Sequence, residues 1–132
     1  MPISTIGTNS LGSTAQIGSL TTASGSAPSY SARAWVNFNG TGTVAIRASG
    51  NVSSITDNGT GDYTVNFTTA LADENYFAAV LGVNNAVDSS WTANSILSRT
   101  TSGVRFGVGY PRSTGGSSTA IDTSEVGAAI FR

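Results

Sequence analysis

The sequence predicts an all-β fold, an antiparallel β-sandwich or barrel of about eight short strands with an extended N-terminal arm. Three observations predict it. Apolar and polar residues alternate in several short runs, and turns rich in Gly and Asn separate these runs. Only 10% of the residues are charged, against about 25% in an average domain, and Ser, Thr, Gly and Asn replace them. No window of about twelve residues has the pattern of a helix.

Residues 1–29 form the expected arm, and residues 30–132 the expected β domain. The arm is mostly Ser, Thr, Gly and Ala, and its isolated apolar residues follow neither the helical nor the strand period. Such a segment buries too little apolar surface to offset its ordering entropy. We therefore expect it to dock on neighbouring copies or on a partner. The candidate anchoring residues are Ile3, Ile6, Leu11, Ile17 and Leu20.

Two hairpins are expected at the start of the β domain. The first strand alternates over residues 32–38 and places Trp35 on the face opposite Val36 and Phe38. Asn-Gly-Thr-Gly at 39–42 predicts the turn to a second strand, with Val44 and Ile46 facing the core. The second hairpin joins residues 52–55 to 62–68 through a turn at 57–61, because Asn and Gly tolerate positive φ.

The remaining strands are expected further along the chain. Residues 70–75 predict a turn or a single helical turn, and 76–83 are nearly all apolar, as in a central strand covered on both faces. Strands follow at 92–98 and 104–110, then a loop over 112–123, then a final strand at 125–131. The predicted core comprises Val36, Phe38, Val44, Ile46, Tyr63, Val65, Phe67, Val80, Val104, Phe106, Val108 and Ile130.

The residue inventory narrows the possible chemistry. The chain has no His, Cys or Lys, so Ser–His or Cys–His catalysis and N/S metal sites are excluded. Each of its seven acidic residues falls at a predicted turn or strand end, so we expect no catalytic pair, no enzyme activity and no cofactor. The acidic run at 57–62 lacks the spacing of a calcium loop. A net charge of −1 and scattered Arg predict no nucleic-acid partner.

Four residues are candidates for ligand contact: Trp35, Trp91, Tyr110 and Arg112. Trp35 either covers a second core or subunit interface, or forms a platform on which a sugar stacks. Trp91 follows a predicted loop, and Tyr110 and Arg112 flank Pro111 at a loop tip. The sequence leaves both alternatives for Trp35 open.

Residues 34–47 (AWVNFNGTGTVAIR) and 52–67 (VSSITDNGTGDYTVNF) resemble segments of phage tail-fibre proteins, as do Asp-Glu-Asn-Tyr at 73–76 and the C-terminal 128–132. The resemblance implies a virion structural protein, usually a tail fibre or its tip, and a homotrimer. It also implies contacts with other virion proteins through the arm and a host surface glycan as a possible partner. The alternatives are a capsid decoration or cement protein and a free, non-catalytic carbohydrate-binding module.

Location follows from the same resemblance. We expect the protein on the tail or capsid surface of the virion. The first residues lack the basic and apolar regions of a signal peptide, so we expect synthesis in the host cytoplasm without one. No stretch approaches the roughly 20 apolar residues of a membrane helix, so we expect no membrane insertion.

Overall fold

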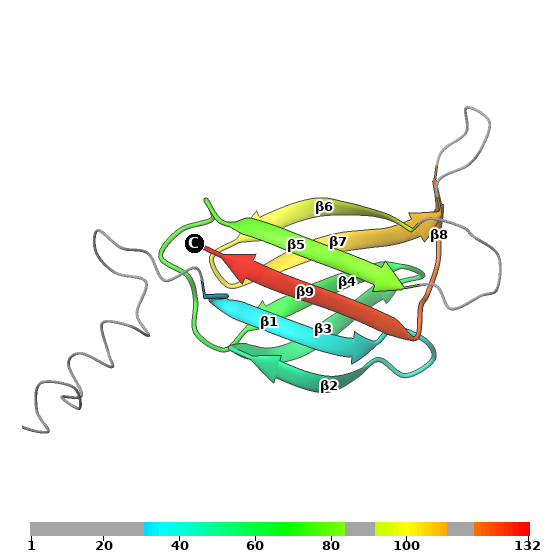
Figure 1. Ribbon diagram of the computed structural model, residues 1–132, viewed down its shortest axis with the longest axis horizontal. Coiled ribbons are helices and arrows are strands. Elements are labelled where there is room, and N and C mark those ends of the chain that lie inside the picture. The colour runs from blue at the N-terminus through cyan, green and yellow to red at the C-terminus, as the bar shows by residue number, and fades with distance from the viewer. Residues whose placement is uncertain (1–30, 84–91, 111–117) are drawn as a thin grey trace, which may run out of the picture. The chain divides into compact units, whose positions relative to one another are not determined.

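The computed structural model describes residues 31–83, 92–110 and 118–132, and in these residues every regular element is a β-strand (Figure 1). The prediction of an all-β fold is confirmed. The strands are β1 (Ala34–Asn39), β2 (Ala45–Gly50), β3 (Val52–Gly59), β4 (Asp62–Phe67), β5 (Phe77–Val83), β6 (Ala93–Thr100), β7 (Gly103–Tyr110), β8 (Thr119–Ala120) and β9 (Glu125–Phe131). The predicted arm, with its five anchoring residues, lies outside the described residues.

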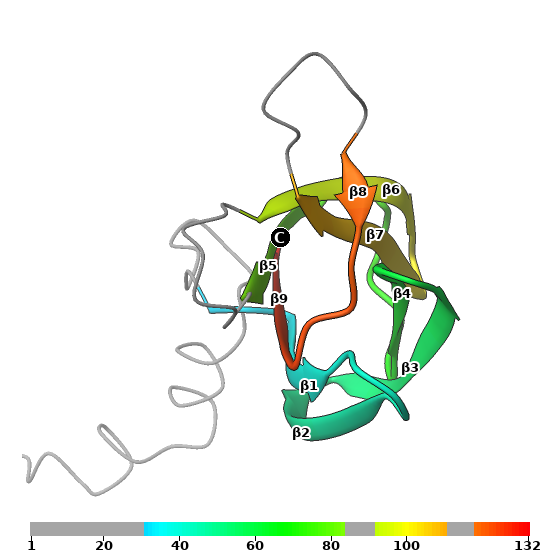
Figure 2. The same ribbon diagram turned by 90° about the vertical axis from the view of Figure 1, so that its right-hand side faces the viewer.

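The strands form two antiparallel sheets that face each other as a sandwich (Figure 2). The first sheet has the order β2-β1-β9-β5, and the second has the order β3-β4-β7-β6, with β8 paired to β7. Hairpins connect β1 to β2, β3 to β4 and β6 to β7. The last strand, β9, lies between β1 and β5, so the first sheet is completed only by the end of the chain.

Local sequence explains the turns. Gly42 (φ 61°), Gly59 (φ 130°) and Gly61 (φ 64°) adopt positive φ in the two N-terminal hairpins, where a side chain would be strained. Asn51 (φ 55°) does the same between β2 and β3, where the chain passes from one sheet to the other. The turn residues singled out in the sequence therefore fix the hairpins.

The core lies between the two sheets and centres on three aromatic rings. Phe38, Tyr63 and Phe106 are fully buried, with ring centroids 5.2–6.5 Å apart. Nine of the predicted core residues are buried, and Val44 and Val80 are partly buried against them. The nine are Val36, Phe38, Tyr63, Val65, Phe67, Val104, Phe106, Val108 and Ile130.

Two expectations about burial are wrong. Ile46 was expected in the core but is 38% exposed, because β2 is an edge strand and its register with β1 shifts beside Arg47. The strand at 76–83 was expected to be central and covered on both faces. Instead β5 is an edge strand, and Phe77 and Leu81 are 65% and 57% exposed. The short strand β8 also occupies part of the predicted loop at 112–123.

Candidate functional site

Apart from the exposed Leu97, the outer face of the β3-β4-β7-β6 sheet is polar, and several of its side chains bond to one another. Asn66 donates from Nδ2 to Ser54 Oγ at 3.1 Å and to Thr56 Oγ1 at 2.9 Å. Arg105 donates to both oxygens of Asp62, at 2.9 and 2.6 Å. The Arg105 guanidinium lowers the pKa of the Asp62 carboxyl below its usual value. Part of this face is therefore occupied by its own side-chain contacts.

The outer face of the β2-β1-β9-β5 sheet is apolar. Cross-strand register places Trp35 opposite Ala129, and Ala129 opposite Ala79, so the three form one row across the sheet. Trp35, which is 44% exposed, ends this row on β1, and Phe77 and Leu81 are exposed on either side of Ala79 on β5. The small residues in the centre leave a shallow groove of about 500 Å³. We call this surface the apolar face.

Arg47 and Asn37, beside the apolar face, already bond to each other. Arg47 donates from Nη1 to Asn37 Oδ1 at 3.2 Å and from Nη2 to the Ser124 carbonyl. The Trp35 indole lies so close to Gly50 that a Cβ atom at position 50 would clash with the ring. A sugar site needs polar groups placed to bond its hydroxyls. The apolar floor and the bonded Arg47 and Asn37 favour the packing of protein side chains over sugar stacking.

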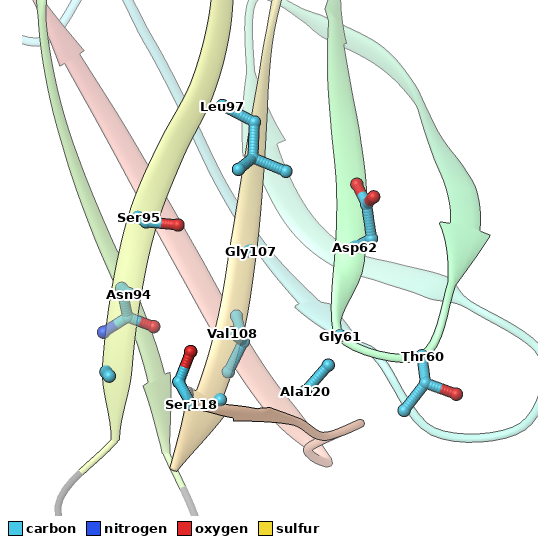
Figure 3. A pocket seen from close by; sticks show the side chains of 12 residues that line it. Thr60, Gly61, Asp62, Asn94, Ser95, Leu97, Gly107, Val108, Ser118 and Ala120 are labelled. Atoms are coloured by element: carbon cyan, nitrogen blue, oxygen red, sulfur yellow. The ribbon is translucent and has the colours of Figure 1, made fainter. Parts of the chain in front are cut away.

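A second, polar hollow of about 250 Å³ lies on the other sheet, between β4, β6, β7 and β8 (Figure 3). Hydroxyl groups of Ser95 and Ser118 line it, together with Thr60 and the Asp62 carboxylate, and Leu97 covers one side. Gly107 leaves space in its floor, because a methyl group there would meet only Ser95 Oγ at 3.4 Å and more distant atoms. Its donors and acceptors suit a small hydroxyl-bearing ligand.

Three of the described carboxylates, those of Asp57, Asp62 and Asp73, make structural contacts. Arg132 pairs with Asp73 and lowers the pKa of that carboxyl, as Arg105 does for Asp62. Asp57 accepts a hydrogen bond from the Gly59 amide at 2.9 Å inside the β3–β4 turn. In the described part of the chain, no three acidic or other metal-binding side chains are grouped as metal ligands. A carboxyl group that acts as a general acid needs a raised pKa, whereas the paired arginines lower the pKa of Asp62 and Asp73.

The predicted contact residues do not gather at one site. Trp35 lies on the apolar face of the first sheet, whereas Tyr110 ends β7 in the second sheet and is partly buried. Trp91 and Arg112 lie outside the described residues. Sequence reasoning missed Phe77 and Leu81, which have the highest fractional exposure on the apolar face. Their signal was the uncharged run of 76–83, which was interpreted as a buried strand.

Comparisons with protein families, with characterised proteins and with solved structures found no match to this chain. Within the described ranges, no helix has the length and apolar character needed to cross a membrane.

Proposed function

We propose that the chain is a non-catalytic structural module of a phage particle, a short tail fibre or fibre-tip component anchored by residues 1–29. The observation that carries the proposal is the difference between the two outer faces. One sheet has a bonded polar face, whereas the other exposes Trp35, Phe77 and Leu81 over a groove. Apolar patches of this kind mark surfaces that another protein covers. The sequence resemblance supplies the phage context.

The proposal includes the partners of the module. Copies of the chain associate with one another, as a trimer by analogy with the fibre proteins that the sequence resembles, and the arm contacts other virion proteins. The Asp62 pair with Arg105 and the other carboxylate contacts support a structural role without catalysis. A capsid decoration protein would use the same kind of arm and the same covered face, and it remains the alternative within the virion.

Immunogold labelling of intact particles tests the proposal. Label at the tail tip is the expected result, and label over the capsid would assign the decoration role instead. Absence of the protein from purified particles would overturn the proposal. Deleting residues 1–29 should leave the β domain folded, because the described core draws on residues from Ala34 onward, but should abolish incorporation. A full-length variant carrying Asn66→Ala, on the polar face, is the matched control.

The polar hollow in Figure 3 favours a second role as a glycan-binding module. Gly107→Val would place a branched side chain against Ser95 Oγ and fill the hollow. A glycan array should then lose whatever binding the wild-type protein has, while Ile46→Val, at an exposed position on the other sheet, should keep it. Equal binding by the Gly107→Val variant would remove the hollow from consideration.

A further inference from the structure

The outer edge of β5 has no hydrogen-bonded partner strand among the described residues, and residues 94–96 of β6 border it across a hollow of about 290 Å³. Figure 1 shows β5 as the last strand of its sheet, paired with β9 on one side only. Gly82 donates its N–H to Asn94 Oδ1 at 3.2 Å and accepts from Thr92 Oγ1 at 2.6 Å, so its backbone points away from β9. Because pairing alternates along an antiparallel strand, Ala78 and Val80 point the same way.

The other edges of the sandwich are interrupted, and the edge of β5 is regular. Register shifts occur in the pairing of β2 with β1, of β3 with β4 and of β6 with β7. The pairing of β5 with β9 runs without a shift from Phe77 to Val83, and none of these seven residues is charged. Bulges and charges are the devices that keep edge strands from pairing with other chains. This edge lacks both.

The edge is also self-complementary. Side chains from Thr92 and Asn94 close it at Gly82, so Ala78 and Val80 are the positions left for pairing. A two-fold axis at Ala79 sets Ala78 of each copy opposite Val80 of the other copy. Each of these two residue pairs exchanges two backbone hydrogen bonds. The same symmetry sets Phe77 directly opposite Leu81 of the second copy. These two side chains are the most exposed large apolar residues described.

We propose that a second copy of this chain pairs with β5 antiparallel, edge to edge about Ala79, and joins the two four-stranded sheets into one. Three arguments select a second copy over another partner. The register that satisfies the free backbone groups also pairs Phe77 with Leu81. The small Ala79 side chain suits the close approach at the axis, about 4.5 Å between Cα atoms in such a pair. Finally, the uncharged strand brings no like charges together.

The area involved sets the strength of the contact. An aromatic side chain presents about 150–250 Å² in total, so Phe77, at 65% exposure, leaves on the order of 100 Å² available in each copy. With Leu81 and the backbone, the edge contact falls at or below the small end of specific interfaces, about 1,200 Å². We therefore expect a reversible dimer that forms at tens of micromolar and is reinforced where copies are held together.

Cysteine cross-linking tests the register. The chain contains no cysteine, so Ala79→Cys introduces a single thiol that the two-fold axis places opposite itself. The expected Cα separation falls within the range of disulfides. Mild oxidation of the full-length protein should give covalent dimers at least about tenfold faster than oxidation of the Leu97→Cys variant, which carries its thiol on the exposed face of the other sheet. Equal rates would overturn the proposal.

Sedimentation measures the same contact without a cross-link. Ala79→Lys places two like charges face to face and should weaken association at least about tenfold, whereas Ala79→Ser should not. Ala79 is exposed, so both variants should keep the wild-type melting temperature. A wild-type protein that is monomeric at every concentration, or an assembly whose mass Ala79→Lys leaves unchanged, would overturn the edge pairing. An assembly whose mass Ala79→Lys leaves unchanged would overturn the edge pairing alone and keep the proposed association of copies, and immunogold labelling measures the location in the particle separately.

Discussion

The Tyr63 hydroxyl lies 2.8 Å from Asp122 Oδ1, inside the end of the sandwich where the chain returns to form β9. The same hydroxyl is 2.9 Å from the Gly40 carbonyl, and the Gly61 amide donates to the same carboxylate oxygen at 2.7 Å. One phenol therefore ties β4 to the β1–β2 hairpin and to the segment before β9.

Removing this hydroxyl should destabilise the fold. Tyr63→Phe leaves the ring in place and withdraws the donor from Asp122 and Gly40, so we expect a loss of about 1–3 kcal/mol in the free energy of unfolding. Urea denaturation measures it. Asp122→Asn keeps a carbonyl oxygen as acceptor and should lose less. An unchanged urea midpoint for Tyr63→Phe would show that the contact contributes nothing.

Stability should fall in alkaline solution. Burial, aided by the nearby Asp122 carboxylate, raises the pKa of Tyr63 above its ordinary value of 10.0, and burial also raises the pKa of Tyr76. A raised folded-state pKa contributes stability that is complete below about pH 10 and is lost as the pH rises beyond it. Urea midpoints measured from about pH 8 to pH 11 should decline above pH 10. Tyr63→Phe should flatten that decline, and an identical slope in the variant would contradict the assignment.

Two substitutions of Asn51, between β2 and β3, separate the loss of its hydrogen bonds from the strain of its positive φ. Its side chain donates to the Arg33 and Thr69 carbonyls, each at 3.1 Å, and accepts from the Thr69 amide at 2.8 Å. Asn51→Ala loses these bonds and forces alanine to φ 55°, whereas Asn51→Gly loses the bonds alone. We expect alanine to cost about 1 kcal/mol more than glycine. Equal unfolding free energies for the two variants would refute the conformational part.

Phe38 and Ile46 are cross-strand partners with different burial, 0% and 38% exposed. Phe38→Ala should cost about 3–5 kcal/mol, because it empties the centre of the aromatic cluster. Ile46→Ala should cost well under half as much, because its side chain already contacts water on the edge strand. Chemical denaturation of both variants measures the difference. Similar losses would mean that β2 is more deeply covered than its exposure indicates.

Features set by neighbouring residues could be predicted from the sequence. Gly42, Gly59 and Gly61 marked the hairpin turns because positive φ is a local requirement, and alternation placed Trp35 on the outside. Features set by strand order could not. The exposure of Ile46 follows from the edge position of β2, and strand order is fixed by contacts distant in sequence.

The apolar run of 76–83 shows the same limit at the candidate site. Its composition indicates burial on both faces, and the isolated chain buries only one, which leaves Phe77 and Leu81 exposed. Within the proposed pair of chains, a second β5 would shield both side chains. If that pair forms, the apolar pattern reflects the environment of the strand in the pair, which the structure of one chain alone does not contain.

The adjacency of β1 and β9 has a mechanical consequence. Ala34, at the start of β1, is the cross-strand partner of Ile130, near the end of β9, so the two ends of the β domain leave the sheet at the same corner. A tensile load across those ends would pull perpendicular to both strands. It would break the hydrogen bonds between β1 and β9 one residue pair at a time. Domains that resist stretching instead load all the bonds of a ladder together, in shear. This sandwich should therefore unfold at low force when it is pulled by its two ends. It should resist a higher force when only one of its ends is an attachment point.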